Sequence, residues 1–349
     1  MIKTIGYAAP VAKSPLAPYN FERRDVGPHD VLIDIKYCGI CHSDIHQARD
    51  EWGGALFPMV PGHEIVGIVN QVGSQVSMFK KDDRVGVGCM VDSCRQCTNC
   101  HEGLQQYCLE GLIPTYNGRE RKGGSLTQGG YSTKIVVDEN FVLRLPPNLD
   151  LAAMAPLLCA GITLYSPLKY WRAETGKNVG IIGLGGLGHV GVKIAAALGA
   201  KVSVFSHSNK KAEDAKYFGA QNFYATADSA IFTKLANTFD LIICTVSVGV
   251  NWNDYLKLLK TDSTMVIIGI PEQEVPVGGA ALIFGRRSLS GSLIGGINET
   301  QEMLNFCSTH HITADIELIS MQDVNKAYER VLQSDVRYRF VIDLASLAN

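Results

Sequence analysis

The sequence predicts an α/β protein that combines a β-rich part with a doubly wound parallel sheet, and three observations lead to this fold class. In the first 150 or so residues, short apolar runs such as Val31–Ile35 are separated by Gly and Pro turn signals. From about Leu151, helical patterns alternate with short β-branched runs, at 178–182, 201–205, 241–245 and 265–268, as in successive βαβ units. Near Ser288 the pattern becomes β-rich again, and two further helices are expected around 300–310 and 321–334.

The length and composition fit a globular protein of two domains. The chain has 349 residues, a length greater than one hydrophobic core usually fills. Hydrophobic residues make up 46% of it and charged residues 19%. Its 32 basic and 34 acidic residues give a net charge of −2, so no nucleic-acid partner is expected. The N-terminal stretch lacks an apolar core of signal-peptide length, and no run of 18 apolar residues occurs. We therefore expect no membrane partner and a cytoplasmic location, where ten reduced cysteines point to metal binding or catalysis.

Four cysteines crowd into the stretch CRQCTNCHEGLQQYC, at gaps of two, two and seven residues. Four thiolates can close a tetrahedral zinc site and leave no position for water, so such a site is structural. The ligands would be Cys94, Cys97, Cys100 and Cys108. An iron–sulfur cluster is the competing interpretation, but its common bacterial run places the fourth cysteine three residues on and follows it with proline. The gap of seven followed by Leu109 favours zinc.

A second set of metal-binding residue types is scattered along the chain. The segments YCGICHSDIH, PGHEIVG and LLCAGIT contain Cys41, His63 and Cys159. A catalytic zinc needs three protein ligands and one open position, which a Cys₂His set would satisfy. From spacing alone the assembly is weak, because a lone apolar-flanked cysteine such as Cys159 also fits a core position.

A glycine-rich turn follows the expected strand 178–182 and precedes an expected helix at 189–198. This GxGxxG between strand and helix is typical of dinucleotide binding, because its glycines allow a tight turn, close backbone approach to a pyrophosphate and helix–strand packing. A purely structural glycine turn is the alternative. The expected coenzyme-binding residues of the turn are Gly183, Leu184, Gly185, Gly186, Leu187 and Gly188.

The residues after the next expected strand, 201–205, indicate which dinucleotide binds. NAD sites usually place an acid there to hold the ribose hydroxyls. This chain has Ser206, Ser208 and Lys211 instead, and no acid until Glu213. Hydroxyl and ammonium groups suit a 2′-phosphate, so the sequence favours NADP(H) over NAD(H). The alternative is an exposed basic loop.

Taken together, these segments resemble the zinc-dependent medium-chain alcohol dehydrogenases, in particular the cinnamyl-alcohol dehydrogenase group with its bacterial NADPH-dependent aldehyde reductases. The motifs that carry the resemblance run in order from about Val31 to Ile342: CGICHSDIH, PGHEIVG, CxxCxxCx₇C, GGYS, LLCAGIT, GLGGLG and GSLIGG. Their joint occurrence is specific, although single members are not.

The resemblance implies a role for each matching position. It makes Cys41, His63 and Cys159 the catalytic zinc ligands and the clustered four cysteines the structural set, so two zinc ions are expected per chain. Glu64 matches a carboxylate that can approach the metal, Asp44 a partner of the ligand histidine, and Ser43 and His46 a proton relay. Positions matching the nicotinamide side of the coenzyme site are Thr163, Thr245, Gly269, Ser292, Leu293 and Ile294.

The resemblance also implies a layout and an activity. A GroES-like catalytic domain is expected at 1–154 and 290–349, with a Rossmann coenzyme domain inserted at 155–289 and a homodimer as the assembly. The activity would be hydride transfer between NADP(H) and a primary alcohol/aldehyde pair, with broad aldehyde reduction that includes aromatic aldehydes. A polyol or sugar dehydrogenase of the same fold, or a non-catalytic binding protein that retains it, are the alternatives. The stretch 113–128 matches no aromatic-lined pocket, and Trp52 fits either a pocket wall or a structural role.

Overall fold

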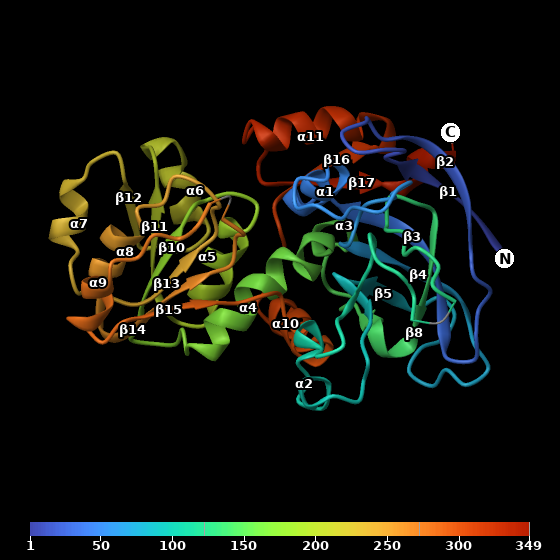
Figure 1. The fold of residues 1–349 in the computed structure, drawn as a ribbon, viewed down its shortest axis with the longest axis horizontal. Coiled ribbons are helices and arrows are strands. Elements are labelled where there is room, and N and C mark those ends of the chain that lie inside the picture. Colours follow the sequence, from blue (N-terminus) through green and yellow to red (C-terminus); the bar gives the residue numbers. More distant parts are fainter. Residues whose placement is uncertain (122, 272, 349) are drawn as a thin grey trace. The chain divides into compact units, whose positions relative to one another are not determined.

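The computed structural model describes residues 1–121, 123–271 and 273–348 and divides them into two compact units. The first unit comprises Met1–Cys159 and Gly295–Asn349, and the second comprises Ala160–Ile294. The chain thus leaves the first unit once and returns to it (Figure 1). The divisions fall at 159/160 and 294/295, where the sequence suggested 154/155 and 289/290.

The first unit is built on a seven-stranded sheet of order β16-β17-β3-β4-β5-β9, with β8 also paired to β3. Two small two-stranded sheets, β1-β2 and β6-β7, accompany it. Its strands are β1 Ile2–Ala8, β2 Ala17–Arg23, β3 Asp30–Gly39, β4 Ile65–Val72, β5 Arg84–Val87, β6 Met90–Asp92, β7 Ile113–Pro114, β8 Lys134–Asp138, β9 Leu143–Arg144, β16 Ile316–Ser320 and β17 Arg339–Asp343. Its helices are α1 His42–Ala48, α2 Thr98–His101, α3 Leu151–Met154, α10 Ile297–Thr309 and α11 Val324–Leu332, with 3₁₀ turns at Gln105–Tyr107, Glu139–Phe141, Ala155–Leu158, Met321–Asp323 and Leu344–Ala348.

The returning C-terminal segment contributes two strands at one end of this sheet, β16 and β17. Strand β17 pairs antiparallel with β3, so that Ile342 lies opposite Cys38. Helix α11 packs its apolar face, which includes Val324, Ala327 and Tyr328 at helical spacing, into the same unit. The last residues of the chain therefore help to build the surroundings of β3 and of the loop that follows it.

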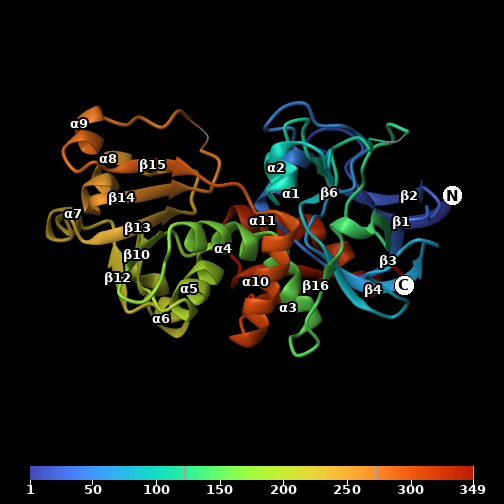
Figure 2. The ribbon, with the colours of Figure 1, turned by 90° about the horizontal axis from the view of Figure 1, so that it is seen from below.

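The second unit is a six-stranded parallel sheet of order β12-β11-β10-β13-β14-β15. The order reverses between β10 and β13, which is the doubly wound arrangement with its topological switch point. Helices α5 and α6 lie on one face of the sheet, and α8 and α9 lie on the other (Figure 2). The strands are β10 Asn178–Ile182, β11 Lys201–Ser206, β12 Asn222–Ala225, β13 Phe239–Cys244, β14 Leu259–Ile267 and β15 Ser288–Gly291. The helices are α4 Ala160–Tyr170, α5 Gly188–Ala197, α6 Ala212–Tyr217, α7 Ala230–Lys234, α8 Trp252–Leu258 and α9 Gly279–Ile283, with a 3₁₀ turn at Asn209–Lys211.

A buried aromatic group organises the core of the second unit. The ring of Phe205 makes edge contacts with Phe239 and Tyr255, at centroid distances of 5.4 and 5.5 Å. Edge-to-face contacts of this kind are among the geometries that aromatic pairs prefer. They join β11, β13 and α8 in one buried group.

The α/β fold class and its parallel sheet are confirmed, and most elements lie close to the predicted positions. The largest difference is β14, predicted at 265–268 and observed from Leu259 to Ile267. Its first half, which includes Thr261 and Asp262, is polar and exposed, so a search for apolar runs does not find it. No single helix within the described residues is long and apolar enough to cross a membrane, although Leu151–Leu158 and Ala160–Tyr170, a bent pair, pass that test together.

Candidate active site and metal centres

Three segments of the first unit that are far apart in the chain bring four potential metal ligands together. Cys41 lies just before α1, His63 and Glu64 lie just before β4, and Cys159 follows the 3₁₀ turn Ala155–Leu158. One ligand atom from each of the four lies within 4.8 Å of the others. The sulfur atoms of Cys41 and Cys159, which are 118 positions apart in sequence, are separated by 3.9 Å. The structure thus assembles a donor set that sequence spacing alone left weak.

Asp44 fixes both the loop of Cys41 and the ring of His63. Its fully buried carboxylate accepts the backbone N–H of Cys41 at 2.8 Å and that of Gly62 at 3.1 Å. It also accepts the hydroxyl of Tyr131 at 3.1 Å. The Nδ1 atom of His63 lies 3.3 Å from the same carboxylate. With Nδ1–H directed at Asp44, the lone pair on Nε2 is the one left for a metal, as in other histidine ligands oriented by a carboxylate.

The pKa values of the cluster disfavour simultaneous ionisation of its acidic groups. A hydrogen bond from the Cys159 thiol holds the pKa of Cys41 well below its usual range, and the same bond raises the pKa of Cys159 well above it. Burial raises the pKa of Glu64 to about 7, although the charge of Arg339 opposes this shift. A divalent cation would remove the conflict, because it stabilises both thiolates together. The residues present therefore fit a zinc ion.

Glu64 has a partner that sequence analysis missed. Its side chain is fully buried, and one carboxylate oxygen, Oε1, forms an ion pair with Arg339 at the start of β17. The other oxygen, Oε2, has no hydrogen-bond partner in the described part of the chain. Arg339 also donates to the backbone carbonyl of Ile40 at 2.8 Å, next to Cys41. In the sequence, Arg339 appears as a cation followed by three apolar residues. This pattern does not reveal which acidic side chain it pairs with.

The side chains matched to a proton relay lie on or beside α1. The Oγ atom of Ser43 is 3.6 Å from the Cys41 sulfur. The Nδ1 atom of His46 pairs with Glu51, and the His46 ring stacks on Trp52 at a centroid distance of 5.0 Å. Glu51 lies beyond the end of the helix, so helical periodicity did not suggest it. Trp52 is 42% exposed and supports the His46 ring.

Cys89 is a further residue without a predicted role that lies beside the cluster. Its thiol is close enough to hydrogen-bond Cys159 and contributes to raising the pKa of Cys159, after the larger contribution of Cys41. It also contacts the carbonyl of Leu158 at 3.8 Å. Its apolar sequence surroundings gave no indication of this proximity.

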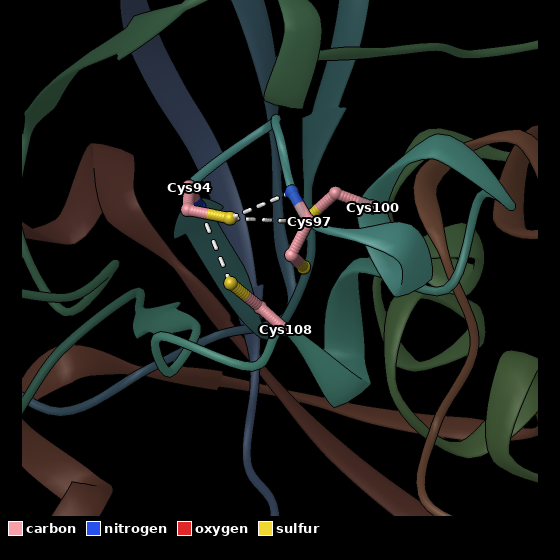
Figure 3. Close-up of side chains that lie close together, drawn as sticks. All are labelled: Cys94, Cys97, Cys100 and Cys108. Carbon is pink, nitrogen blue, oxygen red and sulfur yellow. Dashed lines mark hydrogen bonds between the residues drawn. The ribbon is translucent and has the colours of Figure 1, made fainter.

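The four clustered cysteines converge on a second centre, where their sulfur atoms all lie within 4.8 Å of one another (Figure 3). All four are free thiols rather than disulfides. The single turn α2 carries Cys100 and begins next to Cys97, and the sulfur atoms of Cys94 and Cys100 are 3.8 Å apart. Backbone N–H groups point at the sulfurs: Cys97 donates to Cys94 at 3.3 Å, and Cys94 donates to Cys108 at 3.3 Å. Such donors stabilise thiolates, so this set also fits zinc.

The glycine turn of the second unit has the geometry that its sequence pattern predicts. Gly183 directly follows β10 and has a φ of +93°, and a Cβ there would lie 2.5 Å from Val246. A Cβ on Gly188 would lie 2.1 Å from the Gly183 carbonyl oxygen, whereas one on Gly185 would meet nothing within 4 Å. The first glycine makes the turn, the third allows α5 to pack, and the second leaves open space beside the backbone.

The loop matched to phosphate selection lies at the end of β11. Ser206 is the last residue of that strand, and Ser208 precedes the 3₁₀ turn Asn209–Lys211. The ammonium group of Lys211 donates to the carbonyl of Leu184 at 2.9 Å, which places it against the glycine turn. The first acid after β11, Glu213, belongs to the next helix, α6. The Lys211 cation therefore lies against the glycine turn, and the two serines lie in the segment that leads from β11 to it.

The remaining coenzyme candidates lie in the same unit, mostly where neighbouring strands end. Thr245 follows β13 and donates its hydroxyl to the Ile182 carbonyl at 2.8 Å across the switch point. Gly269 follows β14, and the backbone N–H of Ser292, just after β15, donates to Ile267 at 3.1 Å. Thr163 lies in the first turn of α4. Leu293 and Ile294 end the unit, and Ile294 has a φ of +36°, an unusual value for a β-branched residue.

Comparison with known proteins places the chain in a family. Residues 27–147 match the alcohol dehydrogenase GroES-like domain, and residues 186–309 match the zinc-binding dehydrogenase family. The NADP-dependent alcohol dehydrogenase C of Mycobacterium bovis is 58% identical over 347 residues, which cover 99% of this chain and 100% of that protein. The aldehyde reductase YahK of Escherichia coli is 50% identical, with 100% and 99% covered. Among solved structures, the cinnamyl-alcohol dehydrogenase of Helicobacter pylori complexed with NADP(H) aligns with a TM-score of 0.93, 43% identity and 99% coverage of both chains.

The chain belongs to the zinc-dependent medium-chain alcohol dehydrogenases, in the cinnamyl-alcohol dehydrogenase group. The family expected from the sequence motifs is thus confirmed. It is an enzyme family of oxidoreductases. The first match, 27–147, lies within the first unit, and the second, 186–309, lies mostly in the second unit and ends in the first.

Proposed function

We propose that the protein catalyses hydride transfer between NADP(H) and a primary alcohol/aldehyde pair, with broad aldehyde reduction that includes aromatic aldehydes. The observation that carries the proposal is the convergence of Cys41, His63, Glu64 and Cys159 within 4.8 Å. A zinc ion held by Cys41, His63 and Cys159 would supply a Lewis acid for the carbonyl oxygen. Asp44 orients His63, and Glu64 is the carboxylate that can exchange onto the metal.

The proton needed for aldehyde reduction would be handled by Ser43 and His46. Ser43 lies beside the Cys41 sulfur, where it can donate a hydrogen bond to an oxygen developing negative charge. The carboxylate of Glu51 pairs with Nδ1 of His46 and orients the ring, so that the other ring nitrogen is left to pass a proton. We include Glu51 as a positioning residue of the relay.

For the coenzyme, we propose that the glycine turn binds the pyrophosphate and that Ser206, Ser208 and Lys211 bind the 2′-phosphate. A relative at 58% identity is named NADP-dependent, and a solved structure of the group is complexed with NADP(H). Thr163, Thr245, Gly269 and the segment Ser292–Ile294 would contact the nicotinamide half. In this proposal the unit Ala160–Ile294 acts as the coenzyme domain, and the rest of the chain acts as the catalytic domain.

A substrate panel tests the activity. The zinc-loaded protein is assayed with aromatic and medium-chain aldehydes, each with NADPH and NADH, and with polyols, each with NADP⁺ and NAD⁺. We expect the highest kcat/KM with NADPH and an aldehyde. Preferred polyol oxidation with NAD would favour the polyol dehydrogenase alternative. If the protein contains two zinc ions per chain and turns over none of these substrates, the result would favour the binding-protein alternative.

The coenzyme preference leads to a specific prediction for Lys211→Glu. The substitution places a carboxylate where the phosphate would bind, so KM for NADPH should rise by roughly 100-fold, whereas KM for NADH should change little. Lys210→Glu is the matched control, since Lys210 is exposed and lies one position away. Steady-state kinetics of the three proteins with both coenzymes provide the measurement. Equal losses with NADPH and NADH would mean that the loop does not select phosphate.

We further propose a homodimer that forms through the second unit. Strand β15 lies at one edge of the parallel sheet, and the adjacent Ile283 and Phe284 are 75% and 88% exposed. An exposed strand edge beside large apolar side chains is suited to pairing with a second copy. We also propose a cytoplasmic location, because two sets of free thiols that serve as ligands require a reducing compartment.

The dimer proposal predicts the behaviour of Phe284→Asp. Light scattering of the parent should give twice the chain mass of 37.9 kDa, and the variant should shift towards the monomer, because a charge would be buried in the interface. Tyr217→Asp is the control, because Tyr217 is 81% exposed in α6, on the side of the sheet away from β15. A monomeric parent, or equal dissociation of both variants, would contradict the proposed interface.

A further inference from the structure

The segment 119–121 places a cation against the four-cysteine centre. The Nη2 atom of Arg121 lies 3.9 Å from the sulfur of Cys108. The same atom donates to the carbonyl oxygens of Gly111 at 2.6 Å and Glu110 at 3.4 Å. The Nη1 atom donates to the carboxylate of Glu110 at 3.2 Å, and the Arg121 side chain is 27% exposed. The guanidinium is therefore held from several sides and is not a freely moving surface charge.

The contacts of Arg121 fall on the turn that carries the last cysteine. The backbone N–H of Gly111 donates to the Cys108 carbonyl at 2.9 Å, and Gly111 adopts a φ of +83°. Within this turn, Leu109 also donates its N–H to the sulfur of Cys97 at 3.4 Å. By binding the carbonyls of Glu110 and Gly111, two and three residues after Cys108, the guanidinium holds the turn that carries the Cys108 sulfur.

The negative charge of the four-cysteine centre means that a cation at this position is electrostatically favourable. Four thiolates around one zinc ion carry a net charge of −2, and the backbone N–H donors around them supply only partial charges. A guanidinium is planar and permanently charged, so one group can bind the two carbonyls and face a thiolate at the same time.

We propose that Arg121 is a positioning residue of the four-cysteine zinc centre, where it stabilises the Cys108 thiolate and slows loss of the metal. It does so by joining the segment 119–121 to the turn after Cys108. The proposal concerns retention of the structural metal and does not depend on the substrate or on the coenzyme.

Zinc release from the holoenzyme to an excess of a chromogenic chelator tests the proposal. Arg121→Gln removes the charge, and we expect about one of the two zinc ions per chain to leave roughly tenfold faster than in the parent, within the range seen for groups that contact metal ligands. Arg121→Lys keeps the charge but loses the fork and should be intermediate. The initial turnover rate reports the catalytic zinc separately and should be unchanged in both variants.

Arg119→Gln is the matched control, because Arg119 lies in the same loop and donates instead to the carbonyl of Gly124 at 3.0 Å. It should release zinc at the parent rate. Parent-like release from Arg121→Gln would overturn the proposal. Equal acceleration in Arg119→Gln would also overturn it, since the effect would then reflect a loosened loop. A lack of aldehyde turnover in every protein would count against the proposed function and leave the zinc comparison valid.

Discussion

Replacing Cys41 with alanine is expected to lower kcat/KM for aldehyde reduction by roughly 1,000-fold or more, while NADPH binding persists. A Lewis acid contributes several kcal/mol to the transition state, and each 1.36 kcal/mol corresponds to a tenfold change in rate. Cys41 lies in the first unit, and the residues proposed to bind the coenzyme lie in the second. Binding measured by the fluorescence of NADPH should therefore remain close to that of the parent.

Cys307→Ala is the control for this variant. Cys307 is a fully buried free thiol in α10 that contacts Met303 and is not part of either cysteine cluster. The Cys307→Ala variant should turn over like the parent and contain two zinc ions per chain. The Cys41→Ala variant should contain one zinc ion per chain. Parent-like turnover of Cys41→Ala would rule out Cys41 as a catalytic ligand.

Replacing Arg339 with methionine should lower the free energy of unfolding by about 3–5 kcal/mol, because it leaves the buried carboxylate of Glu64 without its partner. Both side chains of this pair are almost fully buried, at 4% and 0% exposure. Chemical denaturation of the zinc-loaded protein provides the measurement.

Two further variants separate the buried charge from other effects of the Arg339 substitution. The double variant Glu64→Gln with Arg339→Met removes both charges and should recover a large part of the loss. Lys257→Met breaks an exposed pair with Asp254, of 59% and 31% exposure, and should cost less than about 1 kcal/mol. If Arg339→Met cost no more than Lys257→Met, the pair with Glu64 would not be important for stability.

The features that could be predicted from the sequence are those encoded over a short stretch of chain. The glycine turn and the four clustered cysteines each lie within fifteen residues. Over so short a stretch, the spacing of residues in the sequence largely determines how close they lie in space. The strand β10 was predicted with its observed bounds, Asn178–Ile182, because every residue after the first is buried and apolar or Gly.

The contacts that were missed depend on tertiary structure. Arg339 meets Glu64 only because β17 returns from the C-terminal segment and pairs with β3. Cys89 and Cys159 lie in different segments of the chain, so their proximity could not be read from the sequence. Arg121 contacts the four-cysteine centre from a segment that matched no motif. Periodicity describes single elements, and it does not report which side chains meet across the sheet.

An anomalous-diffraction map of the active protein, recorded at the zinc absorption edge, tests the central claim most directly. The account predicts two peaks per chain. One should lie about 2.3 Å from the sulfur atoms of Cys41 and Cys159 and about 2.1 Å from a ring nitrogen of His63. The other should lie among the four clustered sulfurs. An active crystal with no peak bound by Cys41, His63 and Cys159 would contradict the account.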